Sequence, residues 1–99
     1  MAIKITKGSG NVFRDLGFSP AEAEHLRVRA ELMLALERLI ARRRLTQARA
    51  AKLLCVSQPR VSDLVRWRLH RFSIDALVDM LARAGIRVRF TTERRARVA

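Results

Sequence analysis

The sequence contains one cysteine, no tyrosine and few other aromatic residues. A single cysteine excludes both an internal disulfide bond and a zinc site built on several cysteines. The scarcity of aromatic side chains argues against the stacking platforms with which RRM and OB domains hold single-stranded nucleic acid. We expect Cys55 to be a small buried side chain between two packed helices rather than a reactive thiol.

Long apolar runs are also missing. No run approaches the ~20 residues that a helix needs to span a bilayer, and the N-terminus lacks the hydrophobic core of a signal peptide. We therefore expect a cytoplasmic protein that makes no contact with a membrane.

Catalytic and metal-binding patterns are absent as well. The two histidines, His25 and His70, lie far apart and have no other ligand residues at metal-binding spacing. Ser57, Asp63 and His70 have the side chains of a catalytic triad, but nothing resembles a nucleophile elbow, and no glycine-rich phosphate loop follows a strand. We expect no enzymatic activity, no cofactor, no metal and no small-molecule ligand.

Positive charge is abundant. The 99 residues have a net charge of +12, and eighteen of the 21 basic residues are arginine. Arginine binds phosphate through a planar fork, so this bias suits a polyanionic partner. Residues 45–72 are the most one-sided segment, with six basic residues against the single acid Asp63. The charge is therefore concentrated in one short part of the chain.

That segment predicts two short capped helices joined by a tight turn. Thr46 is a suitable N-cap for the first helix, and Ser57, followed by Pro59 in the first turn, for the second. The first helix has apolar residues at helical spacing, namely Ala50, Ala51, Leu53 and Leu54. The second hides Val61 and Leu64 and exposes Gln58, Arg60, Ser62, Asp63 and Arg66. Such a polar face is chemically suited to base edges in a major groove.

These residues resemble the helix-turn-helix of the XRE family, which contains the lambda-type phage repressors. Ala51 stands where that family has a small residue at the helix crossing, and Val61 and Leu64 match its buried positions. Cys55 stands where the family usually has glycine, because the turn tends to adopt a positive φ there. The resemblance implies an all-α, lambda-repressor-like helix-turn-helix bundle of four to five helices.

The flanking sequence predicts further elements. Ser19, Pro20 and Glu22 begin a helix that should run to about Arg43. Ser73 caps a later helix, with Phe72 and Leu77 as a hydrophobic staple, and Gly85 ends it. Residues 86–90 alternate apolar and charged, which predicts a short C-terminal β-strand. This strand must pair with another chain, pair with residues 3–5, or lie as an extended edge.

These elements suggest one domain with two tails. We expect residues 1–11 to form a flexible N-terminal arm, residues 12–90 the helix-turn-helix DNA-binding domain with its motif at 46–66, and residues 91–99 a basic C-terminal tail. The apolar cluster Val12, Phe13, Leu16 and Phe18 fits either a lid on the core, which we favour, or a patch for a partner. The wider sequence from Gly10 to Phe18 and from Arg71 to Leu81 resembles small XRE regulators and HigA-type antitoxins of bacterial toxin–antitoxin pairs.

The resemblance also implies how each side chain is used. In the family the second motif helix enters the major groove and the first crosses the backbone. The base-reading residues would be Gln58, Arg60, Ser62 and Asp63. The phosphate-binding residues would be Gln47, Arg49, Ser57, Arg66, Arg68 and Arg71. Two side chains keep an alternative role: Asp63 either accepts from cytosine or holds an arginine in place, and Trp67 either faces a phosphate or anchors the core.

Three functional hypotheses follow. The first is a sequence-specific, DNA-binding transcriptional regulator, a repressor that binds a palindromic operator as a homodimer, because one short helix contacts too few base pairs. It would be a bacterial protein, associated with the nucleoid when bound to double-stranded DNA. The second is an antitoxin that neutralises an mRNA-cleaving toxin protein and autoregulates its operon. The third is RNA binding or nucleoid coating through charge alone, with no preferred sequence.

Overall fold

A computed structural model describes residues 2–6 and 12–94 of the chain. Its elements are β1 (Ala2–Thr6), α1 (Val12–Asp15), α2 (Pro20–Arg42), α3 (Gln47–Leu54), α4 (Gln58–Val65), the 3-10 turn η1 (Leu69–Arg71), α5 (Ile74–Arg83) and β2 (Arg87–Thr91). The prediction of a helical bundle with a short C-terminal strand is confirmed, with five α-helices in the described residues.

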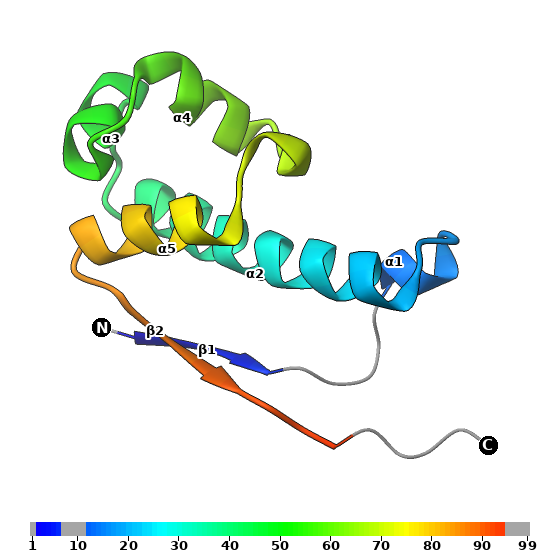
Figure 1. Ribbon diagram of the computed structural model, residues 1–99. Coiled ribbons are helices and arrows are strands. Elements are labelled where there is room, and N and C mark those ends of the chain that lie inside the picture. Colours follow the sequence, from blue (N-terminus) through cyan, green and yellow to red (C-terminus); the bar gives the residue numbers. More distant parts are fainter. Residues whose placement is uncertain (1, 7–11, 95–99) are drawn as a thin grey trace.

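The elements form three layers (Figure 1). The long helix α2 and helix α5 pack together in the middle. Helices α3 and α4 lie on one side of this pair, and the two strands lie on the other side. The helix-turn-helix and the strands are therefore separated by the thickness of the middle layer.

Four helices begin at a side-chain cap, as the sequence predicts. The hydroxyls of Ser19, Thr46, Ser57 and Ser73 accept hydrogen bonds from the backbone N–H three residues later, at 3.2, 3.1, 3.4 and 3.1 Å. Each bond satisfies one of the donors that a helix N-terminus leaves unpaired, and each contributes about 1 kcal/mol. These caps fix where α2, α3, α4 and α5 begin.

Helices α1 to α5 all end in the same way. At each end one residue adopts a positive φ, and two N–H groups fold back onto carbonyls of the last turn. This is the Schellman arrangement. The positive-φ residues are Gly17, Arg44, Cys55, Trp67 and Gly85. Three of them carry a Cβ, which costs each of those positions about 1 kcal/mol relative to glycine.

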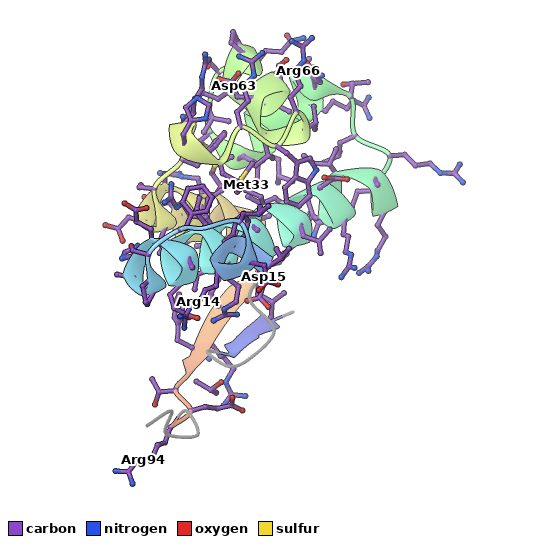
Figure 2. The ribbon with its side chains drawn as sticks, turned by 90° about the vertical axis from the view of Figure 1, so that its right-hand side faces the viewer. Arg14, Asp15, Met33, Asp63, Arg66 and Arg94 are labelled. Atoms are coloured by element: carbon purple, nitrogen blue, oxygen red, sulfur yellow. The ribbon has the colours of Figure 1, made fainter. Side chains whose placement is uncertain are left out.

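The core lies where the middle layer meets α3 and α4. Its fully buried side chains are Phe72, Leu32, Met33, Leu36, Leu54, Leu64, Leu77, Leu81 and Val61. Met33 lies between α2 and the helices above it (Figure 2). Phe72 and Leu77 are both buried in this core, as expected of the predicted staple. The position of the helix-turn-helix is therefore set by close packing against α2 and α5.

Strand β2 pairs with β1 in parallel register, with Ala2 opposite Arg87 and Thr6 opposite Thr91. Of the three expected arrangements, the structure has pairing with the N-terminal segment. The expectation of a flexible arm over residues 1–11 is wrong for Ala2–Thr6, because the exposed backbone of β2 gives these residues hydrogen-bond partners. Residues 1, 7–11 and 95–99 lie outside the described residues. The predicted basic tail from Thr91 onward begins inside β2.

Helix α1 does not form the expected lid. Val12 is 58% exposed and Leu16 is 68% exposed, although α1 contacts the start of α2. Only Phe13 of this helix is half-buried, and its ring meets that of Phe18 edge-on at 6.3 Å. A single turn of helix buries one face, and here the remaining apolar side chains face outward.

Candidate nucleic-acid interface

The two motif helices pack closely through small and branched side chains. Ala50 and Ala51 of α3 and Val61 and Leu64 of α4 are all buried. The methyl group of Ala51 allows the helix backbones to approach, as the family resemblance implies. The polar faces of both helices are thereby directed away from the core.

The turn between them is built on Cys55. This residue has φ 55° and ψ 45°, the left-handed conformation that was expected at this position. The Val56 N–H donates to the Ala51 carbonyl at 3.0 Å, which closes the turn. The Cys55 side chain is exposed, so the prediction that it is buried is wrong. A positive φ at a helix end directs the Cβ outward, and the thiol follows it.

Helix α4 has two different flanks beside its buried stripe. At about 100° per residue, Gln58, Ser62 and Arg66 fall on one flank and Arg60 and Asp63 on the other. Gln58 and Arg66 are exposed and Ser62 is half-buried. Among the described residues, the side chains on this first flank have no hydrogen-bond or ion-pair partner. Figure 2 shows Asp63 and Arg66 at the end of the molecule farthest from the strands.

Arg60 is engaged inside the protein. Its guanidinium carbon lies 4.2 Å from the centroid of the Phe72 ring, and one of its N–H groups donates to the Arg71 carbonyl at 2.6 Å. This geometry is a cation–π contact combined with a charge-assisted hydrogen bond. The sequence-based prediction placed Arg60 among the base-reading residues. In this structure its guanidinium lies over Phe72 and one of its donors is bonded to the loop after α4.

Asp63 holds two arginines. Its carboxylate accepts from Arg71 at 3.1 and 3.3 Å and lies 3.7 Å from a guanidinium nitrogen of Arg68. Its side chain is only 16% exposed, so solvent screens these pairs less than it screens ordinary surface pairs. Of the two roles left open for Asp63, this arrangement matches the holding of arginines.

The predicted phosphate-binding residues lie on one side of the molecule, but some of their side chains are already engaged in contacts within the protein. Gln47 and Arg49 are exposed in the first turn of α3, and Arg66 is exposed at the end of α4. Ser57 uses its hydroxyl oxygen to cap α4. Arg68 and Arg71 are held by Asp63 but remain 38% and 48% exposed.

Trp67 is 39% exposed at φ 58°, so of its two expected roles the structure excludes the anchoring of the core. Phe72 supports Arg60 as well as α5, which sequence reasoning missed. The sequence did contain a sign of this contact: in the helical period Arg60 falls next to the buried stripe of α4 rather than opposite it.

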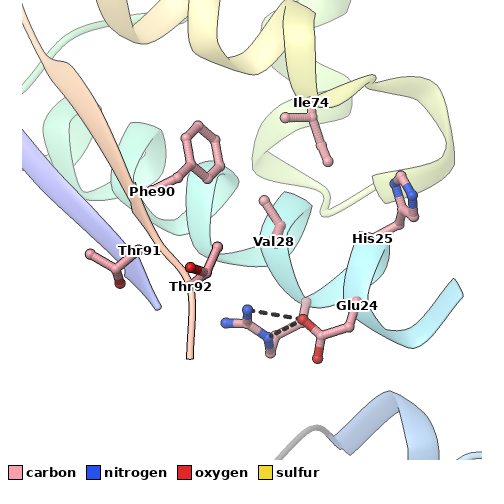
Figure 3. A pocket seen from close by; sticks show the side chains of 8 residues that line it. Glu24, His25, Val28, Ile74, Phe90, Thr91 and Thr92 are labelled. Carbon is pink, nitrogen blue, oxygen red and sulfur yellow. Dashed lines mark hydrogen bonds and ion pairs between the residues drawn. The ribbon is translucent and has the colours of Figure 1, made fainter. Parts of the chain in front are cut away.

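A separate open cavity of about 260 Å³ lies near the start of α2 (Figure 3). Its lining residues are Glu24, His25, Arg27, Val28, Ile74, Phe90, Thr91 and Thr92. Arg27 pairs with Glu24 at 3.2 Å on its rim. The described residues contain no cluster of His, Cys, Asp or Glu arranged to hold a metal ion. No described helix has the length and apolar character to cross a membrane.

Comparison with known proteins agrees with this geometry. A family model described as a helix-turn-helix domain matches residues 12–92. A solved structure named for the XRE family of transcriptional regulators superposes with a TM-score of 0.70 at 35% sequence identity, covering 79% of this chain and 90% of that one. No curated protein matches the chain.

Proposed function

Because the chain belongs to the XRE family of helix-turn-helix transcriptional regulators, we propose that it is a repressor that binds a palindromic operator as a homodimer. The observation that carries this proposal is the free flank of α4. Gln58 is exposed at the N-terminal end of that helix, where a recognition helix meets base edges, and it can pair bidentately with adenine.

The surrounding charge supports the same use of this face. Arg66 on the free flank and Arg49 in the first turn of α3 are exposed and have no ion-pair partner among the described residues. Gln47 lies at the N-terminus of α3, where unpaired N–H groups and the helix dipole favour a phosphate. We assign phosphate binding to these three residues, together with the exposed parts of Arg68 and Arg71.

The dimer follows from the size of the interface. A helix of eight residues, Gln58–Val65, reaches only a few base pairs. Two copies related by a two-fold axis would read two half-sites roughly 34 Å apart, which gives a site long enough to be specific.

Selection of bound duplexes from a random pool tests the proposal. We expect a two-fold consensus whose half-sites lie about one helical turn apart, and Gln58→Ala should remove the preference at one position of each half-site. Sedimentation of the complex should give two chains per duplex. A pool that shows no enriched sequence would contradict sequence-specific regulation and leave binding through charge alone.

A second candidate function is that of an antitoxin, which would bind a toxin protein in addition to DNA. The observation that favours it is the apolar surface at α1 and the residue after it, where Val12 and Leu16 are exposed. This segment is also where the sequence resembles HigA-type antitoxins. Co-purification with the product of a neighbouring gene, abolished in the Val12→Asp and Leu16→Asp double variant, would support this role. An isolated gene would count against it.

A further inference from the structure

Arg60 and Asp63 are one helical turn apart on α4 and hold the same residue of the following loop. Arg60 donates to the backbone carbonyl of Arg71 at 2.6 Å. The guanidinium of Arg71 donates in return to the carboxylate of Asp63 at 3.1 Å. These bonds form a closed ring in which Arg71 is bound through both its backbone and its side chain.

Phe72 connects this ring to the core. Its side chain is 2% exposed, and its outer ring face is covered by the Arg60 guanidinium at 4.2 Å. Phe72 also directly precedes Ser73, the N-cap of α5. A contact between α4 and Phe72 therefore fixes α4 relative to the start of α5, the helix that packs on α2.

The same interactions involve the groups that base reading would need. The Arg60 guanidinium lies over Phe72 with one N–H bonded to Arg71, and both carboxylate oxygens of Asp63 accept from Arg71. Gln58 and Ser62 on the other flank have no partner among the described residues. A planar guanidinium stacked on a ring and bonded to a carbonyl is held by several interactions at once.

From this geometry we infer that Arg60 is a positioning residue rather than a base-reading one. It acts through Phe72 and Arg71 to set the angle at which α4 is presented to DNA, and Asp63 supports it from the next turn. Base preference is then carried by the free flank, Gln58 and Ser62. The part of this inference that concerns base reading rests on the proposed function.

Arg60→Met tests this role, because it removes the guanidinium and keeps an apolar stem beside Phe72. In the free protein, hydrogen exchange at the Arg71 and Phe72 amides should accelerate on the order of tenfold. With DNA, the affinity should fall by one common factor, within about tenfold, for every duplex. The ranking of duplexes should stay that of the wild type. Arg49→Met is the matched control, since it removes one positive charge from α3 and should leave exchange at η1 unchanged.

Phe72→Leu provides a second variant, because this buried side chain does not reach DNA. It should reproduce the common decrease in affinity, and adding Arg60→Met should lower the affinity no further. Unchanged amide exchange in Arg60→Met would overturn the inference. So would a weakened preference at a single base pair with all other duplexes bound as before.

Failure of the proposed function gives a different result. In that case the wild-type protein binds all duplexes alike and has no ranking to preserve. The exchange measurement in the free protein still decides whether Arg60 holds the loop after α4.

Discussion

At the scale of single residues, the turn of the helix-turn-helix carries a conformational cost at Cys55. A side chain at φ 55° is less stable there than glycine, which has no Cβ. Within the part of the chain that the structure describes, the exposed thiol makes one weak interaction, with the Lys52 carbonyl at 3.8 Å. The turn is thus held by its backbone hydrogen bonds and not by the side chain of Cys55.

Cys55→Gly should therefore raise the free energy of unfolding, by about 1 kcal/mol. Urea denaturation measures this change. Cys55→Ala is the control, because it removes the thiol but keeps the Cβ, and should change stability by less than about 0.5 kcal/mol. An equal gain in both variants would show that the thiol, not the backbone conformation, is the source of the cost.

Side-chain roles at this scale were only partly predictable. The caps Thr46 and Ser57 were found because the bond from a hydroxyl to an N–H three residues later depends on local sequence alone. The role of Arg60 was not found, since it depends on Phe72 and Arg71, twelve and eleven residues away. Residue type identified Arg60 as a suitable base-reading residue, but tertiary interactions determine where its guanidinium lies.

At the scale of elements, strand β2 has an inner face that packs on the core and an outer face that is exposed. Val88 is half-buried and packs on the core, while Arg87 and Arg89 are exposed on the other face. Ile3 of β1, the register partner of Val88, also packs on the core. The strand pair therefore covers the side of α2 and α5 that faces away from α3 and α4.

Val88→Asp should destabilise the fold by about 1–3 kcal/mol, because it places a carboxylate against apolar side chains. Thermal unfolding measures the effect. Arg89→Asp introduces the same poor strand former on the exposed face and should change stability by less than about 0.5 kcal/mol. Equal destabilisation in the two variants would mean that β2 does not pack through Val88.

Elements that local sequence signals define were predicted correctly, whereas the sequence did not determine which strand pairs with β2. Helix starts and the exit at Gly85 depend on neighbouring residues, and alternation alone marked residues 86–90 as a strand. Parallel pairing joins distant segments, so no local pattern chooses between a partner chain and residues 3–5. The same limit applies to α1, whose apolar residues fitted both a lid and a free surface.

At the scale of the whole molecule, basic side chains occur on two opposite sides. Arg49 and Arg66 lie on the helix-turn-helix, and Arg87 and Arg89 lie on the outer face of the strands. The middle layer separates the two groups (Figure 1). A duplex bound along α4 is beyond the reach of the strand arginines, and salt screens charges at such separations.

Charge reversal at these two sites should have unequal effects on DNA affinity. The double change of Arg49 and Arg66 to Glu should lower affinity by about tenfold or more and make the log–log salt slope less negative by about 0.9 for each phosphate that is no longer neutralised. The same double change at Arg87 and Arg89 alters net charge equally but should leave the slope as in the wild type. Titrations at several salt concentrations measure both quantities. Equal decreases in affinity would contradict an interface confined to α3 and α4.

The pairing of β1 with β2 determines when the fold is completed. Ala2 meets Arg87, 85 residues later, so during synthesis the first strand must wait until almost the whole described chain has left the ribosome. Closing so long a loop is slow compared with forming helices. The helices can therefore pack together before strands β1 and β2 pair. The amides of Ala2–Thr6 should be among the last to gain protection during refolding and the first to lose it in mild denaturant.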